Sequence, residues 1–162
     1  MTDDPETAAL MIDQLADEVK ATIQELRDLA HGIYPPLLAD SGLSEALKAA
    51  GRRSTLPVTV TAMSIGRYSL EIETAIYFCC LEALQNAAKH APGATVTIRI
   101  WEESGGLLFS VIDDGPGFEA SVARQGHGYV NMADRLGAIG GTVRWDSQPG
   151  QGSRISGSVP LI

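Results

Sequence analysis

Four polar side chains share one face of a segment that otherwise has the pattern of a buried helix. Glu82, Asn86 and His90 follow one another in steps of four residues, and Lys89 lies beside His90. On an α-helix, this spacing places side chains on one face. An amide oxygen such as that of Asn86 can ligate Mg²⁺, Lys89 can meet a phosphate, and Glu82 can polarise a nucleophile. A helix that shows its solvated face to water explains the same residues equally well.

An acidic turn directly follows a predicted strand. Asp113 and Asp114 are followed by Gly115, Pro116 and Gly117, residue types that enforce a tight turn. The turn leaves a carboxylate just beyond the edge of the sheet, where Asp113 can accept an N–H group from a base. A turn of this composition is more often a plain loop. It therefore indicates a binding site only in combination with the other motifs of the sequence.

Two glycine turns complete the set of candidate binding residues. Gly126, His127 and Gly128 precede a predicted helix, so their amides and the positive end of the helix dipole would face an anion. Residues 150–153 add further amides and the hydroxyl of Ser153. Each turn also fits an ordinary loop or hairpin. The sequence contains neither of the two commonest nucleotide-binding glycine motifs, so a nucleotide site here requires a different fold.

Helices and strands alternate along the chain and must position these residues. The period of the apolar residues predicts helices over residues 8–33, 44–52, 70–90 and 129–139. Alternation predicts strands over residues 58–62, 94–101, 107–112, 142–145 and 153–159. Ser44 is expected to cap the second helix, and a linker is expected after residues 34–36. These elements predict an α+β fold, a two-layer α/β sandwich with a largely antiparallel or mixed sheet.

The first predicted helix carries an apolar stripe that its own sequence does not cover. Apolar residues recur in steps of about three and four at Ile12, Leu15, Val19, Leu26, Leu29 and Ile33. These steps are those of a seam between helices, which favours packing between subunits. The alternative is a terminal helix that lies on its own domain.

Composition limits the partners and the compartment. The chain has 162 residues and a formal net charge of −8 without a cluster of Lys and Arg, which argues against nucleic acid as a partner. Cys79 and Cys80 are adjacent in an apolar run, so we expect buried thiols in a reducing compartment. No stretch reaches the roughly 20 apolar residues of a membrane span, and no signal peptide pattern opens the chain. We therefore expect a cytoplasmic segment without membrane contact.

Taken in order, these segments resemble the boxes of the ATPase superfamily that includes gyrase, heat-shock chaperones, histidine kinases and mismatch-repair proteins. The resemblance covers about residues 57–162, with an Asn box at residues 82–90 and the turns described above. Residues 128–136 resemble the Gly-Leu-x-x-Met-x-x-Arg run of nitrate-sensor-type histidine kinases, with Tyr129 in place of the usual leucine. Residues 26–38 are similar to the end of the second dimerisation helix in that branch.

This resemblance implies a Bergerat-type ATP-binding fold in residues 55–162, and a second dimerisation helix with its linker in residues 1–54. It implies that Asn86 holds Mg²⁺ and that Asp113 recognises the amino group of adenine. Gly115 and Gly117 would let the backbone approach the base, and Glu82 would be a candidate catalytic base beside Asn86. The residues around the phosphates would be Lys89, His90, Gly126, His127, Gly128 and Ser153.

The implied activity is that of a protein histidine kinase. It would transfer the γ-phosphoryl group of ATP to a histidine outside this chain, from which a response regulator takes it, within a homodimeric kinase. The acceptor motif of the family is missing, and His31 lies at the end of the second-helix pattern, so we expect no self-phosphorylation by this piece alone. Two alternatives stay open: a nucleotide-gated, anti-sigma-like serine kinase, and a non-catalytic ATP-binding interaction module.

Overall fold

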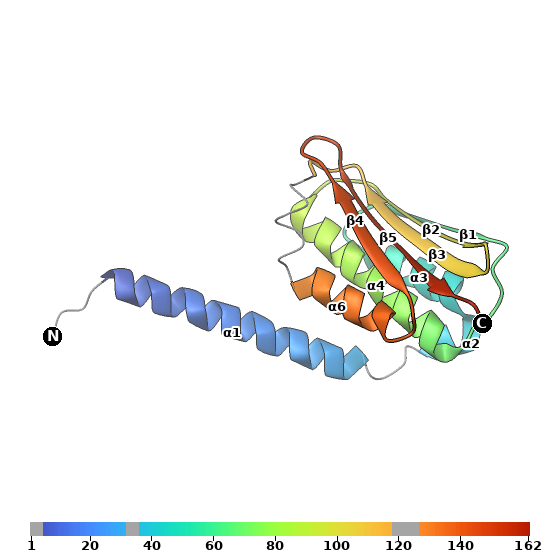
Figure 1. Ribbon diagram of the computed structural model, residues 1–162. Coiled ribbons are helices and arrows are strands. Elements are labelled where there is room, and N and C mark those ends of the chain that lie inside the picture. The colour runs from blue at the N-terminus through green and yellow to red at the C-terminus, as the bar shows by residue number, and fades with distance from the viewer. Residues whose placement is uncertain (1–4, 32–35, 118–126) are drawn as a thin grey trace. The chain divides into compact units, whose positions relative to one another are not determined.

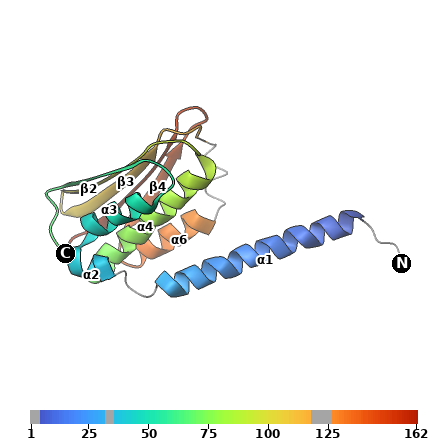
Figure 2. The same ribbon diagram turned by 180° about the vertical axis from the view of Figure 1, so that it is seen from behind.

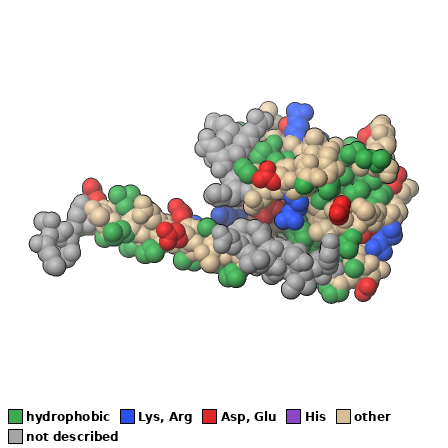
Figure 3. Space-filling model, turned by 60° about the horizontal axis from the view of Figure 1, so that its bottom comes forward, with side chains coloured by type: hydrophobic (Ala, Val, Ile, Leu, Met, Phe, Trp, Pro, Cys, Tyr) green, Lys and Arg blue, Asp and Glu red, His purple; other side chains and the backbone are tan. Residues whose placement is uncertain are grey.

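The computed structural model describes residues 5–31, 36–117 and 127–162, which fall into two compact units, Met1–Pro35 and Pro36–Ile162 (Figure 1). In the first unit, the described residues form helix α1 (Pro5–His31), which confirms the predicted long helix. Figure 3 shows hydrophobic and acidic side chains along its surface. The exposed large apolar side chains of α1 are Leu10, Met11, Ile12, Leu15, Val19, Ile23 and Leu26. No helix in the described ranges has the length and apolar character needed to cross a membrane.

The second unit is built on a five-stranded sheet, with the strands in the order β1-β2-β3-β5-β4. The strands are β1 (Val58–Met63), β2 (Val96–Glu103), β3 (Gly106–Asp113), β4 (Thr142–Ser147) and β5 (Ser153–Pro160). β1 pairs with β2 in parallel, and the other neighbouring pairs are antiparallel, which confirms the predicted mixed sheet.

Helices cover one face of this sheet. They are α3 (Leu43–Arg53), α4 (Leu70–His90) and α6 (His127–Gly137), and the short α2 (Pro36–Ser41) packs against α3 and α4. Figures 1 and 2 show α3, α4 and α6 on the same side of the strands. Alternate residues of each central strand face the helices, and Ile98 and Phe109 are fully buried there. The arrangement confirms the predicted two-layer α+β architecture.

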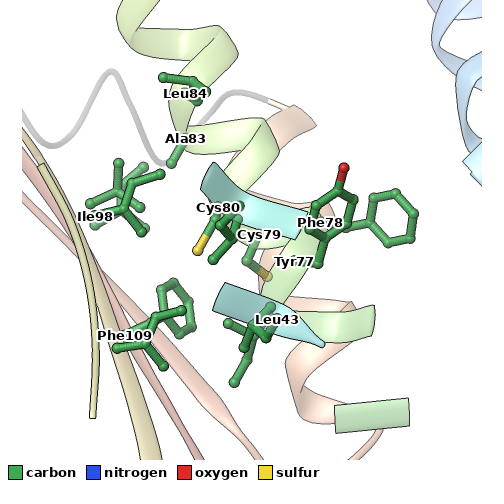
Figure 4. Close-up of a cluster of buried hydrophobic side chains, with 14 of the residues drawn as sticks. Leu43, Tyr77, Phe78, Cys79, Cys80, Ala83, Leu84, Ile98 and Phe109 are labelled. Atoms are coloured by element: carbon green, nitrogen blue, oxygen red, sulfur yellow. The ribbon is translucent and has the colours of Figure 1, made fainter. Parts of the chain in front are cut away.

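The core lies between α4 and the sheet. Figure 4 shows Ile98 and Phe109 of the sheet facing Cys80, Ala83 and Leu43 of the helices. Cys79 and Cys80 are free and buried, as predicted. Burial raises the pKa of the Cys79 thiol to about 12, and that of Cys80 well above its usual value. Both thiols therefore stay protonated at neutral pH and act as small apolar core groups.

The entry into α3 differs from the expected linker and cap. Residues 36–41 form the short helix α2, and Gly42 rather than Ser44 holds the cap position of α3. Gly42 has a φ of 84° and donates its N–H to the carbonyl of Leu38 at 3.0 Å. This positive φ favours glycine and turns the chain between the end of α2 and the start of α3. The carbonyl of Gly42 then accepts the N–H of Ala46 at 3.1 Å, so α3 begins at once and Ser44 lies inside its first turn.

A half-buried ion pair between Arg67, which precedes α4, and Glu73 connects α2 to α4. The carboxylate of Glu73 has no exposed surface and accepts the Arg67 Nε–H at 2.9 Å and a second Arg67 N–H at 3.2 Å. Arg67 also donates to the carbonyls of Leu38 and Ala39, at 3.4 and 2.9 Å. One guanidinium thus hydrogen-bonds both the buried carboxylate of α4 and two carbonyl groups of α2.

We expect Glu73→Ala to lower the free energy of unfolding by about 2–3 kcal/mol, because it removes several hydrogen bonds and leaves a cavity. Glu73→Gln keeps the volume and the acceptor oxygen, so its loss should be smaller. Urea denaturation of the chain measures both values. Glu71→Ala is the matched control, because Glu71 is an exposed acid in the same helical turn. Equal small losses in all three variants would show that the pair does not hold α2.

Candidate functional site

A pocket opens between α4 and the sheet, with about 360 Å³ of empty space including its mouth. It brings together residues that are far apart in the sequence. Its lining residues are Ala83, Asn86, Ala87, His90, Ala91, Val111, Asp113, Gly117, Trp145, Ser153 and Ile155. Five of them, Asn86, His90, Asp113, Gly117 and Ser153, are site residues predicted from the sequence. Sequence analysis did not predict the alanines at positions 83, 87 and 91, whose steps of four leave room on this face of α4.

Helix α4 positions the polar side chains as the spacing predicted. Its N-terminus is capped by Ser69, whose hydroxyl accepts the N–H of Ile72 at 3.4 Å. Near its other end, Asn86 and His90 line the pocket, whereas Lys89 is exposed and is not a lining residue. The helix therefore supplies an amide and an imidazole to the pocket, and places an ammonium group at its outer surface.

Gly128 brings the first turn of α6 against α4. A Cβ atom at Gly128 would lie 2.5 Å from Glu82 Oε1 and 3.4 Å from Asn86 Nδ2, so both α4 side chains lie close to this backbone. The first turn of a helix carries free N–H groups and a partial positive charge. Glu82, Asn86 and the amino end of α6 thus form one polar group. Gly126 lies outside the described residues, as does the side chain of His127, the first residue of α6.

Asp113 and Asp114 have separate environments. Asp113 lines the pocket, and its carboxylate accepts the N–H of Gly115 at 3.0 Å. Partial burial nevertheless raises the pKa of the Asp113 carboxyl, and the charge of Asp114 adds to the increase. Asp114 is exposed and accepts the N–H of Thr95 at 2.6 Å, which fastens the turn to the segment before β2. Only Asp113 of this pair is therefore available to a ligand in the pocket.

Close backbone packing fixes the acidic turn in place. A Cβ at Gly115 would lie 2.4 Å from the Cβ of Ala91, so the turn rests on the end of α4. Gly117 has a φ of 65°, and a Cβ there would lie 2.2 Å from the carbonyl oxygen of Gln148. These contacts lock the turn between α4 and the β4–β5 connection.

Trp145 is a lining residue that the sequence did not indicate as part of a site. Its indole N–H donates to Ser153 Oγ at 2.8 Å, and its ring lies against that of Tyr129 with centroids 6.2 Å apart. Alternation along β4 indicates only that Trp145 faces the core. Ser153 pairs with Asp113 in the β3–β5 register, which places its hydroxyl beside the carboxylate turn.

If Asp113 accepts a hydrogen bond from adenine, as the resemblance implies, Asp113→Asn should weaken ATP binding roughly tenfold to hundredfold, because a charge-assisted hydrogen bond is replaced by a neutral one. The same change should slightly raise the free energy of unfolding at neutral pH, by less than about 1 kcal/mol given the partial exposure of the group. Calorimetry with ATP measures the first effect, and urea denaturation measures the second.

The pH dependence of that stability gain follows from the raised pKa of Asp113. The folded state binds this proton more tightly than the unfolded state, so stability is lost as pH rises from the unfolded pKa through the folded pKa. The gain from Asp113→Asn should therefore vanish at a pH below the ordinary carboxyl pKa. Asp134→Asn on the exposed surface of α6 is the control. A variant that loses stability at neutral pH would contradict this account.

Comparisons with known proteins agree with the fold. The chain is 28% identical over 162 residues to the sensor histidine kinase MctS of Rhizobium johnstonii, covering 94% of this chain and 35% of that protein. It is 27% identical over 179 residues to the signal transduction histidine-protein kinase/phosphatase UhpB of Salmonella typhimurium, covering 95% and 34%. The chain therefore spans about a third of the length of these curated relatives.

Two solved structures share the architecture. The blue-light activated histidine kinase of Erythrobacter litoralis EL346 has a TM-score of 0.64 at 23% identity, with 75% of this chain and 41% of that chain covered. The histidine kinase AdeS of Acinetobacter baumannii has a TM-score of 0.63 at 16% identity, with 94% and 84% covered. A family model described as histidine kinase-, DNA gyrase B-, and HSP90-like ATPase matches residues 71–162, more than half of the sequence. The chain therefore belongs to this family of ATPases.

Proposed function

We propose that this chain is the ATP-binding catalytic part of a two-component sensor histidine kinase. The observation that carries the proposal is the pocket of an ATPase-family domain in which Asn86, Asp113 and Gly117 meet. The relatives named as sensor histidine kinases support the activity. The run at residues 128–136 supports the nitrate-sensor-type branch.

The nucleotide base would bind at the Asp113 end of the pocket. The Asp113 carboxylate would accept a hydrogen bond from the amino group of adenine. Gly115 and Gly117 would allow the backbone to approach the adenine ring. Ser153 is paired with Asp113 in the register of β3 and β5, so we place it at the base end of the pocket and not among the phosphates. The groups left for the phosphates are Lys89, His90 and the glycine turn at residues 126–128.

Mg²⁺ fits the polar group at Asn86. Within the described ranges, no three His, Cys, Asp or Glu side chains gather into a cluster that could hold a metal ion. A single oxygen ligand, here the amide oxygen of Asn86, would suffice, because Mg²⁺ at nucleotide sites takes few protein ligands and is completed by phosphate oxygens and water. When bound, the ion would neutralise phosphate charge, which matters in a chain with a formal net charge of −8.

Phosphoryl transfer would be mainly a matter of positioning. A nitrogen of the acceptor histidine would form the N–P bond as the bond from the γ-phosphorus to the bridging oxygen breaks, and ADP would leave with that oxygen. Glu82 lies beside the first turn of α6 and would accept the proton that the imidazole loses. The acceptor would be on a segment outside this chain.

The two parts of the chain would have different tasks. Residues 1–54 would supply the second dimerisation helix and its linker, and residues 55–162 the catalytic domain. The exposed apolar side chains of α1 suit burial in a homodimer of the full kinase. The linker helices α2 and α3 belong to the same compact unit as the pocket. The phosphoryl group would come from cytoplasmic ATP. A response regulator would then take it from the acceptor histidine.

Calorimetric titration with ATP and ADP, with and without Mg²⁺, tests the proposal. We expect Mg²⁺-dependent ATP binding and no self-labelling from radiolabelled ATP. A second polypeptide that carries an acceptor helix should become labelled with acid-labile phosphate, as phosphohistidine is. Acid-stable label on a serine would favour the anti-sigma-like alternative instead. A chain that binds ATP but labels no candidate acceptor would favour the interaction module, and one that binds no ATP would contradict all three.

A further inference from the structure

We infer that Trp145 determines base specificity, because its indole N–H occupies one acceptor position of the Ser153 hydroxyl and so favours hydrogen-bond donation by that hydroxyl beside Asp113. The inference rests on the proposed function and extends it by assigning selectivity for the base to a residue of β4. Trp145 and Ser153 are 6% and 8% exposed, so their hydrogen bond of 2.8 Å is shielded from water.

The direction of this hydrogen bond carries the argument. An indole N–H can only donate, so Ser153 Oγ must accept. The hydroxyl hydrogen is then directed away from Trp145. Among the described residues, that hydrogen has no acceptor, and Ser153 lines the pocket. The hydroxyl is therefore prepared to donate to a group that enters the pocket.

The neighbour of this donor is an acceptor. Ser153 and Asp113 are directly paired residues on β5 and β3, and both line the pocket. Adenine carries an amino group next to an unprotonated ring nitrogen, so it matches an acceptor beside a donor. Hypoxanthine and guanine carry a carbonyl next to an N–H group, which opposes this pattern at both positions. A hydroxyl without a partner could serve either base equally, whereas the hydrogen bond from the indole N–H occupies one lone pair and polarises the O–H, which favours donation.

Tyr129 holds the indole in place. Its ring packs against Trp145 at an angle of 30°, and its hydroxyl donates to the carbonyl of Val143 at 3.4 Å. Because Tyr129 lies in the first turn of α6, the ring connects that helix to β4. The orientation of Trp145 is thus fixed from two elements.

The test is Trp145→Phe, which keeps an aromatic ring and removes the N–H. Calorimetry on the 162-residue chain compares ATP, inosine triphosphate and 1-deaza-ATP, which lacks the ring nitrogen next to the amino group. We expect ATP affinity to fall about three- to tenfold, as for one neutral hydrogen bond, and inosine triphosphate affinity to stay or rise. Binding of 1-deaza-ATP should be the same in Trp145→Phe and in the unchanged chain.

A double-mutant cycle separates positioning from general packing. Ser153→Ala should lower ATP affinity by a similar factor, and the Trp145→Phe/Ser153→Ala variant should be no weaker than the weaker single variant. Trp101→Phe is the control, because Trp101 lies on β2 and does not line the pocket. Thermal melting verifies that each variant is folded.

Two outcomes would overturn the inference while leaving the ATP site in place. One is an unchanged ratio of ATP to inosine triphosphate affinity in Trp145→Phe. The other is an equal loss for all three nucleotides, which would show a merely structural role. Failure of the unchanged chain to bind ATP would instead overturn the proposed function itself.

Discussion

Replacing Asn86 with alanine should abolish the Mg²⁺-dependent part of ATP binding, with a loss of about 100-fold in affinity. Asn86 lines the pocket and lies next to Glu82 and the first turn of α6. Removal of its amide oxygen would leave the ion without its direct protein ligand in our proposal. A loss of this size corresponds to about 3 kcal/mol, in the range expected for a metal contact to phosphate groups.

The measurement for Asn86→Ala is calorimetry with ATP in Mg²⁺ and in EDTA. The variant and the unchanged chain should bind ATP with the same affinity in EDTA, because the substitution removes only the Mg²⁺-dependent contribution to binding. Gln85→Ala is the matched control, since Gln85 is an exposed amide on the preceding position of α4. Equal Mg²⁺ dependence in Asn86→Ala and Gln85→Ala would remove Asn86 from the metal site.

The second large effect is expected at Gly152, where alanine should lower the free energy of unfolding by about 3 kcal/mol or more. Gly152 has a φ of 73°, and a Cβ there would lie 2.2 Å from the carbonyl oxygen of Asp113. The substitution therefore combines an unfavourable left-handed conformation with a clash against backbone. Because the clashing atom belongs to the acidic turn, the variant should also lose ATP affinity.

Gly150 supplies the matched control for Gly152. It has a φ of 81°, but a Cβ there would have no atom within 4 Å among the described residues. Gly150→Ala should therefore cost only about 1 kcal/mol, the price of the left-handed conformation alone. Urea denaturation of both variants gives the difference between them. Equal costs at the two positions would contradict the close contact between the β4–β5 connection and the acidic turn.

Patterns local in sequence predicted most of the fold. Alternation and helical spacing located the strands of the sheet and α4, because one face of each element is buried. The short α2 was not predicted, because it begins at the second of two adjacent prolines and its six residues are too few to show a helical period. Glu73 resembles an ordinary acid in a first helical turn, yet it is fully buried. Its partner Arg67 lies before the helix, so spacing along α4 does not reveal the pair.

In the candidate site too, local patterns predicted some residues and missed others. Steps of four predicted that Asn86 and His90 share a face, and the pocket contains both. Trp145 and Ser153 lie on paired strands, so their contact depends on a register that no pattern along a single strand determines. The roles of all these residues toward nucleotide and metal stay predictions.

The Arg67–Glu73 pair also has a mechanical consequence. The chain enters the second unit at Pro36, and Arg67 ties the end of α2 to the first turn of α4. Helix α4 has 21 residues, a rod of about 30 Å, and its far end contributes Asn86 and His90 to the pocket. A force applied through the preceding segment is therefore passed by this ion pair to α4, the helix that forms one wall of the pocket.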